Sequence, residues 1–198
     1  MRGMGRVLTA LAVLTWASCA KQQSPAAFVE RYLELHRSRD VDALLALHTA
    51  DAEFVIPGQE PLRGTAALRD LFEWDAVLGS ELVMSGIRSD ADTILIDSVI
   101  ERNKWFQALG LVEVRHRAGT RIVLRDGRIA ATYPAAFDDE TQRRLMDRFQ
   151  PLLRWLGEHR REALDQLLPG GKFRYDAATA RLWLEVLAEW NTSRRPDG

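Results

Sequence analysis

Residues 28–72 decide the fold, and they read FVERYLELHRSRDVDALLALHTADAEFVIPGQEPLRGTAALRDLF. Apolar residues recur at three- and four-residue spacing in three parts of this stretch, which is the period of a helix with one buried face. Between the second and third parts, a β-forming run ends at Pro57-Gly58, a pair that interrupts regular structure. The predicted elements are a helix from Phe28 to His36, a second helix capped by Asp40 or Asp42 and carrying Leu44, Leu45, Leu47 and His48, a strand from Glu53 to Ile56, and a third helix from Ala66 to Trp74.

Downstream of this stretch the apolar period changes to that of strands. Turn-forming residues separate several of these runs, and such short connections favour antiparallel neighbours. Lys104–Gly110 interrupts the series and is interpreted as one helical turn. The predicted strands are Glu81–Arg88, Thr93–Asn103, Leu111–Ala118, Thr120–Arg125 and Arg128–Tyr133.

From Asp138 onward the helical period returns. Pro151 falls inside the first apolar stripe, where it is expected to kink the helix or to start a new one. Asp176 is placed to cap a last helix whose buried face carries Trp183 and Trp190. Residues 138–198 are therefore predicted to form a helical extension. We expect it to pack across the open end of the preceding domain as a lid, and the alternative is packing on the outer face of the sheet.

The first residues have the pattern of an export signal. Arg2 and Arg6 precede an uncharged apolar run at residues 7–16, which is too short to span a bilayer. The run ends in Trp16-Ala17-Ser18-Cys19, which resembles a bacterial lipoprotein signal. This resemblance implies residues 1–18 as the signal peptide, a lipid on Cys19, a tether over residues 19–25 and residence in the cell envelope. The alternatives are cleavage after Ala20, giving a periplasmic or secreted protein, and an uncleaved start.

Composition excludes several classes of protein. The chain has 198 residues, of which 46% are hydrophobic and 28% charged, which indicates a globular protein rather than a disordered one. Its 27 basic and 28 acidic residues give a net charge of −1, whereas nucleic-acid binding is typically accompanied by a basic excess. The one cysteine allows no internal disulfide, and the four histidines lack metal-site spacing. We therefore expect no metal, no cofactor and no nucleic-acid partner.

The order of elements is similar to that of the NTF2-like superfamily, in its SnoaL-like and ketosteroid-isomerase branch. The residues that carry the resemblance are Arg31-Tyr32, Asp40–Phe54, Pro57-Gly58, Gly64–Leu68 and the turn Asp126–Ile129. The resemblance implies an α+β domain over residues 26–137, with a curved antiparallel sheet wrapped around three N-terminal helices. It also implies a cone-shaped pocket between sheet and helices.

The same resemblance bears on catalysis. Ketosteroid isomerases use a tyrosine, a general-base aspartate and a protonated aspartate. Tyr32 falls where the tyrosine is expected, whereas Ile56 and Thr120 fall at the positions of the two acids. Because two of the three groups are replaced, the resemblance does not imply isomerase activity of that type.

Seven residues are candidates for the pocket. Tyr32 and His36 share one helix face. His116 is predicted to lie on the same, inward face of its strand as Val112, Val114 and Ala118, because side chains alternate along a strand. Each of these residues is alternatively an ordinary packing residue, which is also how His48 is interpreted. Asp97 and Glu101 are predicted to share one strand face, which lies either in the pocket or in solvent. Trp74 and Trp105 are candidates for an apolar wall.

Three hypotheses for function follow from these residues. The first is an exported binding protein for a small, largely apolar ligand. The second is a proton-transfer enzyme that uses Tyr32, His116 and Asp97 or Glu101, which requires these groups to lie within about 3–5 Å of one another. The third is an interaction module that docks a partner through the extension or the outer sheet face. A homodimer is compatible with each of them.

Overall fold

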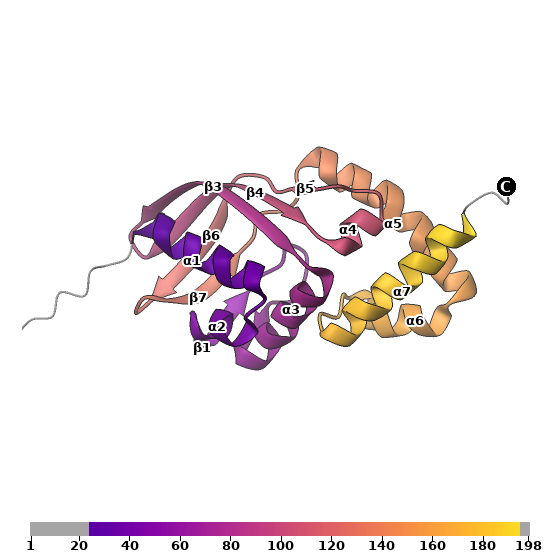
Figure 1. The fold of residues 1–198 in the computed structure, drawn as a ribbon, viewed down its shortest axis with the longest axis horizontal. Helices are drawn as coiled ribbons and strands as arrows, with labels where there is room; N and C mark the ends of the chain where they lie inside the picture. The colour runs from indigo at the N-terminus through magenta and orange to yellow at the C-terminus, as the bar shows by residue number, and fades with distance from the viewer. Residues whose placement is uncertain (1–23, 195–198) are drawn as a thin grey trace, which may run out of the picture.

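The computed structural model describes residues 24–194 (Figure 1). The predicted signal peptide, the lipidation site at Cys19 and residues 19–23 of the tether lie outside the described residues. The helices are α1 (Pro25–Ser38), α2 (Val41–Ala46), α3 (Gly64–Leu78), α4 (Lys104–Ala108), α5 (Asp139–His159), α6 (Arg161–Leu167), the 3₁₀ turn η1 (Pro169–Gly171) and α7 (Ala177–Ser193). The strands are β1 (His48–Phe54), β2 (Leu62–Arg63), β3 (Glu81–Asp90), β4 (Thr93–Arg102), β5 (Val114–Arg115), β6 (Thr120–Arg125) and β7 (Arg128–Tyr133).

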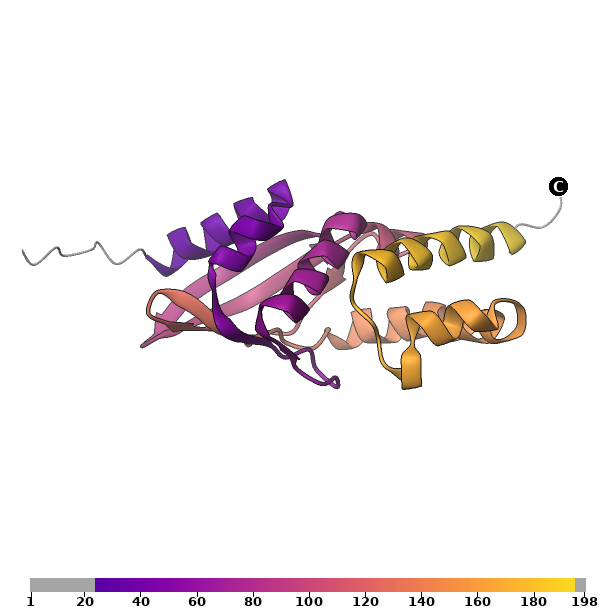
Figure 2. The same cartoon turned by 90° about the horizontal axis from the view of Figure 1, so that it is seen from below.

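The strands form one sheet in the order β2-β1-β7-β6-β4-β3, with β5 pairing on β4. Its neighbours are antiparallel except for β1 and β7, which run parallel. Helices α1 and α3 lie against one face of the sheet (Figure 2). Their apolar stripes and the inner face of the strands together form a buried core that includes Val29, Leu68, Ile94 and Ile122. The predicted α+β class, with a curved sheet around the N-terminal helices, is confirmed.

Local capping explains where several helices begin. The side chain of Ser24 accepts a hydrogen bond from the Ala27 amide at the start of α1, and Asp40 does the same for α2. Asp176 begins α7 with a capping box, in which its side chain accepts from the Thr179 amide and the Thr179 hydroxyl accepts from the Asp176 amide. Of the two residues predicted as possible caps of α2, Asp40 is the one that caps it, and the cap predicted at Asp176 is confirmed.

The first strand begins earlier than the sequence predicted. Strand β1 runs from His48 to Phe54, whereas the prediction was Glu53–Ile56 with His48 on a helix. The His48 ring donates from Nδ1 to the Leu44 carbonyl at 2.8 Å and packs on Phe72. The side chain of His48 therefore bonds back to helix α2, while its backbone is the first residue of β1. His48 is a packing residue, as interpreted.

The strand predicted at Leu111–Ala118 is much shorter in the structure. Only Val114 and Arg115 are paired with β4, and Val112 is 73% exposed, so it does not share an inward face with His116. The His116 amide still donates to the Val99 carbonyl of β4. On its other edge the segment bonds to the residues before α5: the Arg115 carbonyl accepts from the Asp138 amide, and the Arg117 amide donates to the Ala136 carbonyl.

Strands β3 and β4 bend where Gly86 faces Asp97. Gly86 has a φ of +67°, and a Cβ atom at this position would lie 2.6 Å from the Cβ of Asp97. Before the bend Ile96 points into the core, and after it Val99 does, so the inward-facing residues of β4 change from even to odd numbers. As a result, Asp97 points to solvent and Glu101 points inward.

Helices α5, α6 and α7 lie beyond the end of the sheet, and α7 packs on α3 and α4 (Figures 1 and 2). Their apolar stripes form a second core around Trp105 and Trp183. Helix α5 continues through Pro151, so of the two expected outcomes, a kink or a new helix, the new helix is excluded. The extension lies at the open end of the cone rather than on the outer face of the sheet, which confirms the predicted placement.

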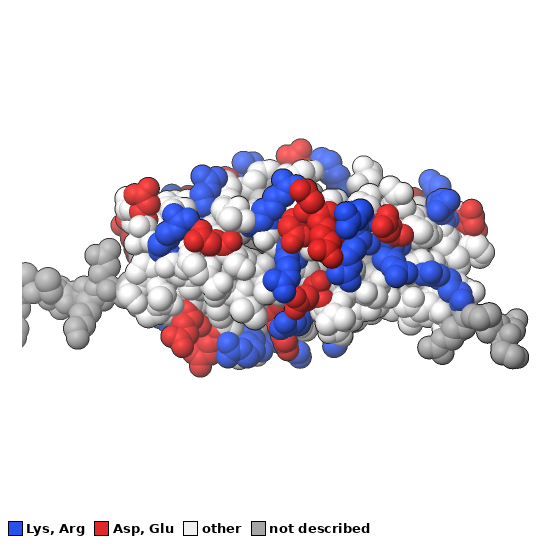
Figure 3. Space-filling model, turned by 90° about the horizontal axis from the view of Figure 1, so that it is seen from above, with Lys and Arg blue, Asp and Glu red and all other residues white. Residues whose placement is uncertain are grey.

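The surface carries charges of both signs. Basic and acidic side chains lie side by side on the face shown in Figure 3. Many of them are paired, such as Arg88 with Asp97 at 2.5 Å. Within residues 24–194, no helix is both long and apolar enough to cross a membrane.

Candidate functional site

A cavity of about 350 Å³ lies between the helices, the inner face of the sheet and the extension. Most of its wall is apolar and comes from strands and helices alike, including Leu82, Met84, Val99 and Ile122. The bend at Gly86 places the first three of these side chains inward. A volume of this size fits a small organic molecule.

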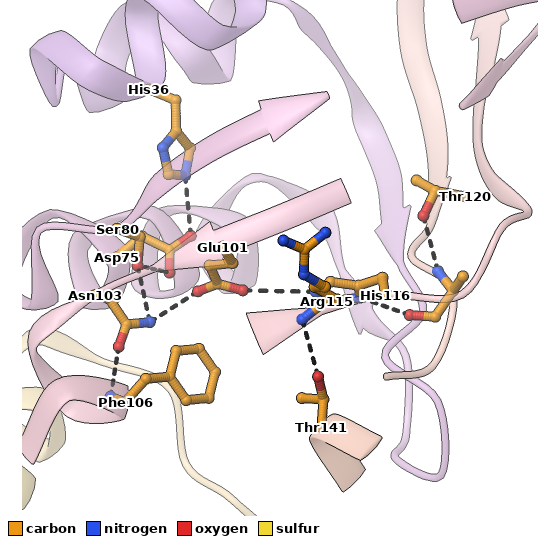
Figure 4. Close-up of polar contacts among 11 residues, drawn as sticks. His36, Asp75, Ser80, Glu101, Asn103, Phe106, Arg115, His116, Thr120 and Thr141 are labelled. Atoms are coloured by element: carbon orange, nitrogen blue, oxygen red, sulfur yellow. Dashed lines mark hydrogen bonds and ion pairs between the residues drawn. The ribbon is translucent and has the colours of Figure 1, made fainter. Parts of the chain in front are cut away.

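One wall of the cavity carries a row of polar side chains (Figure 4). His36 Nε2 lies 3.3 Å from Asp75 Oδ2, and the hydroxyl of Ser80 donates to the other carboxylate oxygen at 3.2 Å. Asn103 Nδ2 lies 3.4 Å from the Ser80 hydroxyl and 2.8 Å from Glu101 Oε1. This row of polar side chains therefore links α1, α3 and β4 along the cavity wall and holds two carboxylates in fixed positions.

The row of polar side chains continues from Glu101 to His116. The Nδ1 atom of His116 donates to the Ala135 carbonyl at 2.7 Å, which leaves Nε2 facing Glu101 Oε2 at 3.8 Å. In the neutral ring this Nε2 is a bare acceptor opposite a carboxylate, which favours the protonated ring. Glu101 and His116 therefore form an ion pair in the cavity when His116 is protonated.

Two of the histidines have raised pKa values. Burial lowers the pKa of His36, but the hydrogen bond and the charge of Asp75, together with Glu101, outweigh burial and raise it. For His116, burial is likewise outweighed by Glu101 and the Ala135 carbonyl. In His48, which faces no carboxylate, burial dominates and lowers the pKa. The cavity histidines therefore keep protons at a pH where His48 has lost its own.

Tyr32 lies one helical turn before His36, and their ring centroids are 6.0 Å apart. Burial raises the pKa of Tyr32 far above its usual value, and the charges of Asp75 and Glu101 raise it further. The Tyr32 hydroxyl forms no hydrogen bond within the described part of the chain. It is therefore a protonated donor that is available to a ligand.

The structure brings together most of the residues singled out in the sequence. The cavity is lined by Tyr32, His36, Trp74, Trp105, Glu101 and His116. Asp97 is outside it and pairs with Arg88 at the surface, so the expectation that Asp97 and Glu101 share one face is wrong, because the strand bends between them. Ile56 and Thr120 also line the cavity, and Thr120 accepts from the Ala135 amide.

Sequence reasoning missed Asp75 and the contribution of the extension. Asp75 stands on the buried stripe of α3, four residues after Leu71 and three before Leu78, and an acid at such a position was the signal that could have found it. Tyr175 and Phe173 line the cavity from the loop before α7. Gln59 donates to the Tyr175 hydroxyl at 2.6 Å, which joins this loop to the cone.

A family model described as the SnoaL-like domain matches residues 29–132, which is more than half of the chain. The chain belongs to this family. The matched residues carry α1 to β7 almost completely, so the extension lies outside the SnoaL-like domain. No curated protein matches the chain.

Solved structures resemble the SnoaL-like domain at low identity. SalBIII, an epoxide hydrolase/cyclase-like enzyme in pyran ring formation of salinomycin, superimposes with a TM-score of 0.51 at 16% identity, covering 59% of this chain and 92% of its own. An LEH-like epoxide hydrolase from M. tuberculosis has a TM-score of 0.48 at 19% identity, with coverage of 64% and 92%. RV0760c from Mycobacterium tuberculosis, in complex with estradiol-17beta-hemisuccinate, has a TM-score of 0.49 at 15% sequence identity, and the match covers 60% of this chain and 98% of RV0760c. SalBIII thus supports the fold of the SnoaL-like domain.

Metal ligands are not gathered in the SnoaL-like domain or the extension. Within residues 24–194, no three His, Cys, Asp or Glu side chains are grouped in a way that could hold a metal ion. The polar side chains of the cavity can donate and accept hydrogen bonds, and His36 and His116 can exchange protons.

Proposed function

We propose that the chain is an exported, lipid-anchored protein that binds a small, largely apolar molecule in the cavity of its SnoaL-like domain. The observation that carries the binding proposal is the cavity itself, about 350 Å³ in volume, with an apolar wall facing one row of polar side chains. An apolar wall supplies affinity, and a few fixed polar groups orient the ligand. Export and the anchor are supported by the signal pattern that ends at Cys19.

Binding is tested with prodan, a neutral naphthalene dye whose emission shifts to the blue in apolar surroundings. The wild-type protein is expected to bind it with a dissociation constant in the micromolar range. Met84→Trp fills part of the cavity and is expected to weaken binding at least about tenfold, which corresponds to about 1.4 kcal/mol. Val83→Trp is the matched control, because Val83 immediately precedes Met84 on β3 but is exposed to solvent.

Equal binding by both tryptophan variants and the wild type would place the dye outside the cavity and contradict the proposal. The anchor is tested separately, by mass spectrometry of the mature N-terminus after expression in a bacterium. An acylated Cys19 is expected, and a first residue after Ala20 without lipid would contradict the anchor.

A second function, proton transfer, is favoured by the pair of Glu101 and His116. The two side chains face each other beside an apolar wall, and Tyr32 offers a donor in the same cavity. A positioned base typically accelerates proton transfer by about 10²–10⁴-fold. This hypothesis uses Glu101, a candidate from the sequence, because Ile56 stands where the ketosteroid isomerases that the chain resembles have their general-base aspartate.

The base is tested with 5-nitrobenzisoxazole, which opens to a coloured phenolate when a base removes its carbon-bound proton. We expect an acceleration of at least about 100-fold over buffer. The rate should rise with pH through the raised pKa of His116, because loss of the His116 proton frees the carboxylate. Glu101→Gln is expected to abolish this rate, and Asp97→Asn on the outer face of the same strand to preserve it. A wild-type rate equal to that in buffer would exclude this second function.

A further inference from the structure

We propose that the ligand is an organic cation, with an amine or quaternary ammonium group on an apolar body, and that its charge lies between Asp75 and Glu101. This inference rests on the proposed binding function and names the class of ligand. It starts from the charges of the cavity wall. Two carboxylates line the cavity, and no lysine or arginine is found among the lining residues.

Arginines close to the cavity in sequence are turned away from it. Arg102 and Arg115 stand next to Glu101 and His116, yet both point to the surface and pair with Glu113 at 2.6 Å. Arg117 pairs at the surface with Asp139. The cavity carboxylates are therefore not neutralised by any guanidinium, although three lie within a few residues of them.

The neutral partners of the carboxylates leave acceptor capacity for a ligand. Asp75 accepts from Ser80, and Glu101 accepts from Asn103. Ser80 and Asn103 carry no charge, and His36 and His116, which face the same two carboxylates, carry one only when they are protonated. A carboxylate can accept about four hydrogen bonds in all. An ammonium group between the two acids would supply further donors and, where the histidines are neutral, the positive charge.

Aromatic rings cover much of the remaining wall. Tyr32, Trp74, Trp105, Phe137 and Tyr175 all line the cavity, and Trp74 meets Tyr175 edge to face at 5.4 Å. The faces of such rings attract cations, and the attraction grows when water is excluded. Carboxylates combined with aromatic walls favour an organic cation over an anion of the same shape.

The field in the cavity has the sign that this inference needs. Burial raises the pKa of Tyr175 to about 12, and the charges of Asp75 and Glu101 contribute in the same direction, as they do for Tyr32. His36 and His116 are the titratable bases that face the acids, and they oppose a cation only when protonated. Affinity for a cation should therefore fall as the pH drops below their raised pKa values.

Three naphthalenes that differ in charge test the inference by displacement of prodan. They are 2-naphthylmethylamine as the cation, 2-naphthylmethanol as the neutral analogue and 2-naphthoate as the anion, all measured at pH 8. We expect the amine to bind at least about tenfold more tightly than the alcohol, and the acid at least about tenfold more weakly, because one charge of each sign meets the same two carboxylates.

Variants assign the preference to the cavity acids. Glu101→Gln and, independently, Asp75→Asn are expected to reduce the ratio of amine to alcohol affinity at least about threefold. Asp97→Asn, which removes the same charge from the outer face of β4, should leave the ratio unchanged. If one of the two acid variants does not fold, the other variant and the three naphthalenes measured on the wild-type protein still test the inference.

The outcomes separate the two proposals. Binding of the alcohol without a preference for the amine would overturn the cation inference and leave the binding function standing. Failure of prodan and all three naphthalenes to bind would overturn both. A preference for the amine that survives both acid variants would place the cation elsewhere and also overturn the inference.

Discussion

Replacing Trp183 with alanine is expected to lower the free energy of unfolding by about 3–5 kcal/mol, the range typical of a buried tryptophan. The Trp183 side chain has no exposed surface and lies at the centre of the second core. Its ring meets those of Trp105, Phe149 and Phe173 at centroid distances of 5.6–5.9 Å. The loss would therefore leave a void beside two residues that line the cavity, Trp105 and Phe173.

The measurement is urea denaturation followed by circular dichroism. Trp155→Ala is the control, because Trp155 is half-buried on α5 and stacks on His159. Its expected cost is smaller, about 1–2 kcal/mol, since less surface is uncovered. Equal losses in both variants would show that the extension is not organised around Trp183.

Replacing Gly86 with alanine is expected to cost about 2–5 kcal/mol. A non-glycine residue with a left-handed backbone pays about 1–2 kcal/mol, and a Cβ forced against a neighbour pays about 1–3 kcal/mol more. Both penalties apply here, because φ is +67° and the new Cβ would meet that of Asp97 at 2.6 Å. Neither strand can relieve the overlap without giving up the bend that points Glu101 into the cavity.

Gly127→Ala separates the two penalties. Gly127 has a φ of +73°, but no atom lies within 4 Å of the added Cβ, so only the backbone penalty of about 1–2 kcal/mol is expected. Both variants are compared by thermal and urea unfolding. A cost for Gly86→Ala no greater than for Gly127→Ala would remove the close approach of β3 and β4 as the cause of the bend.

The order of elements could be predicted because each element depends on nearby residues. Apolar spacing and capping residues act within one or two turns, which is why the caps at Asp40 and Asp176 were predicted correctly. The strand predicted at Leu111–Ala118 was too long, because only Val114 and Arg115 form a ladder with β4. The β-forming composition of that run does not show where the ladder stops, nor that the segment also bonds to residues about twenty positions away.

The site was partly predictable for the same reason. The faces of Tyr32 and His36 follow from their spacing on one helix, and the structure places both on the cavity wall. The faces of Asp97 and Glu101 could not be derived, because strict alternation fails at the Gly86 bend. The contact between His36 and Asp75 joins residues 39 positions apart, and only the folded chain brings them together.

The division of the cavity wall between two parts of the chain has a consequence for how such proteins diversify. Tyr175 and Phe173 reach the cavity from a segment that is not part of the SnoaL-like domain. Substitutions at these two loop positions would change the shape of the cavity while leaving the strands of the sheet and the Trp183 core of the extension in place. A related protein with this architecture could therefore change its ligand through the loop before α7 alone.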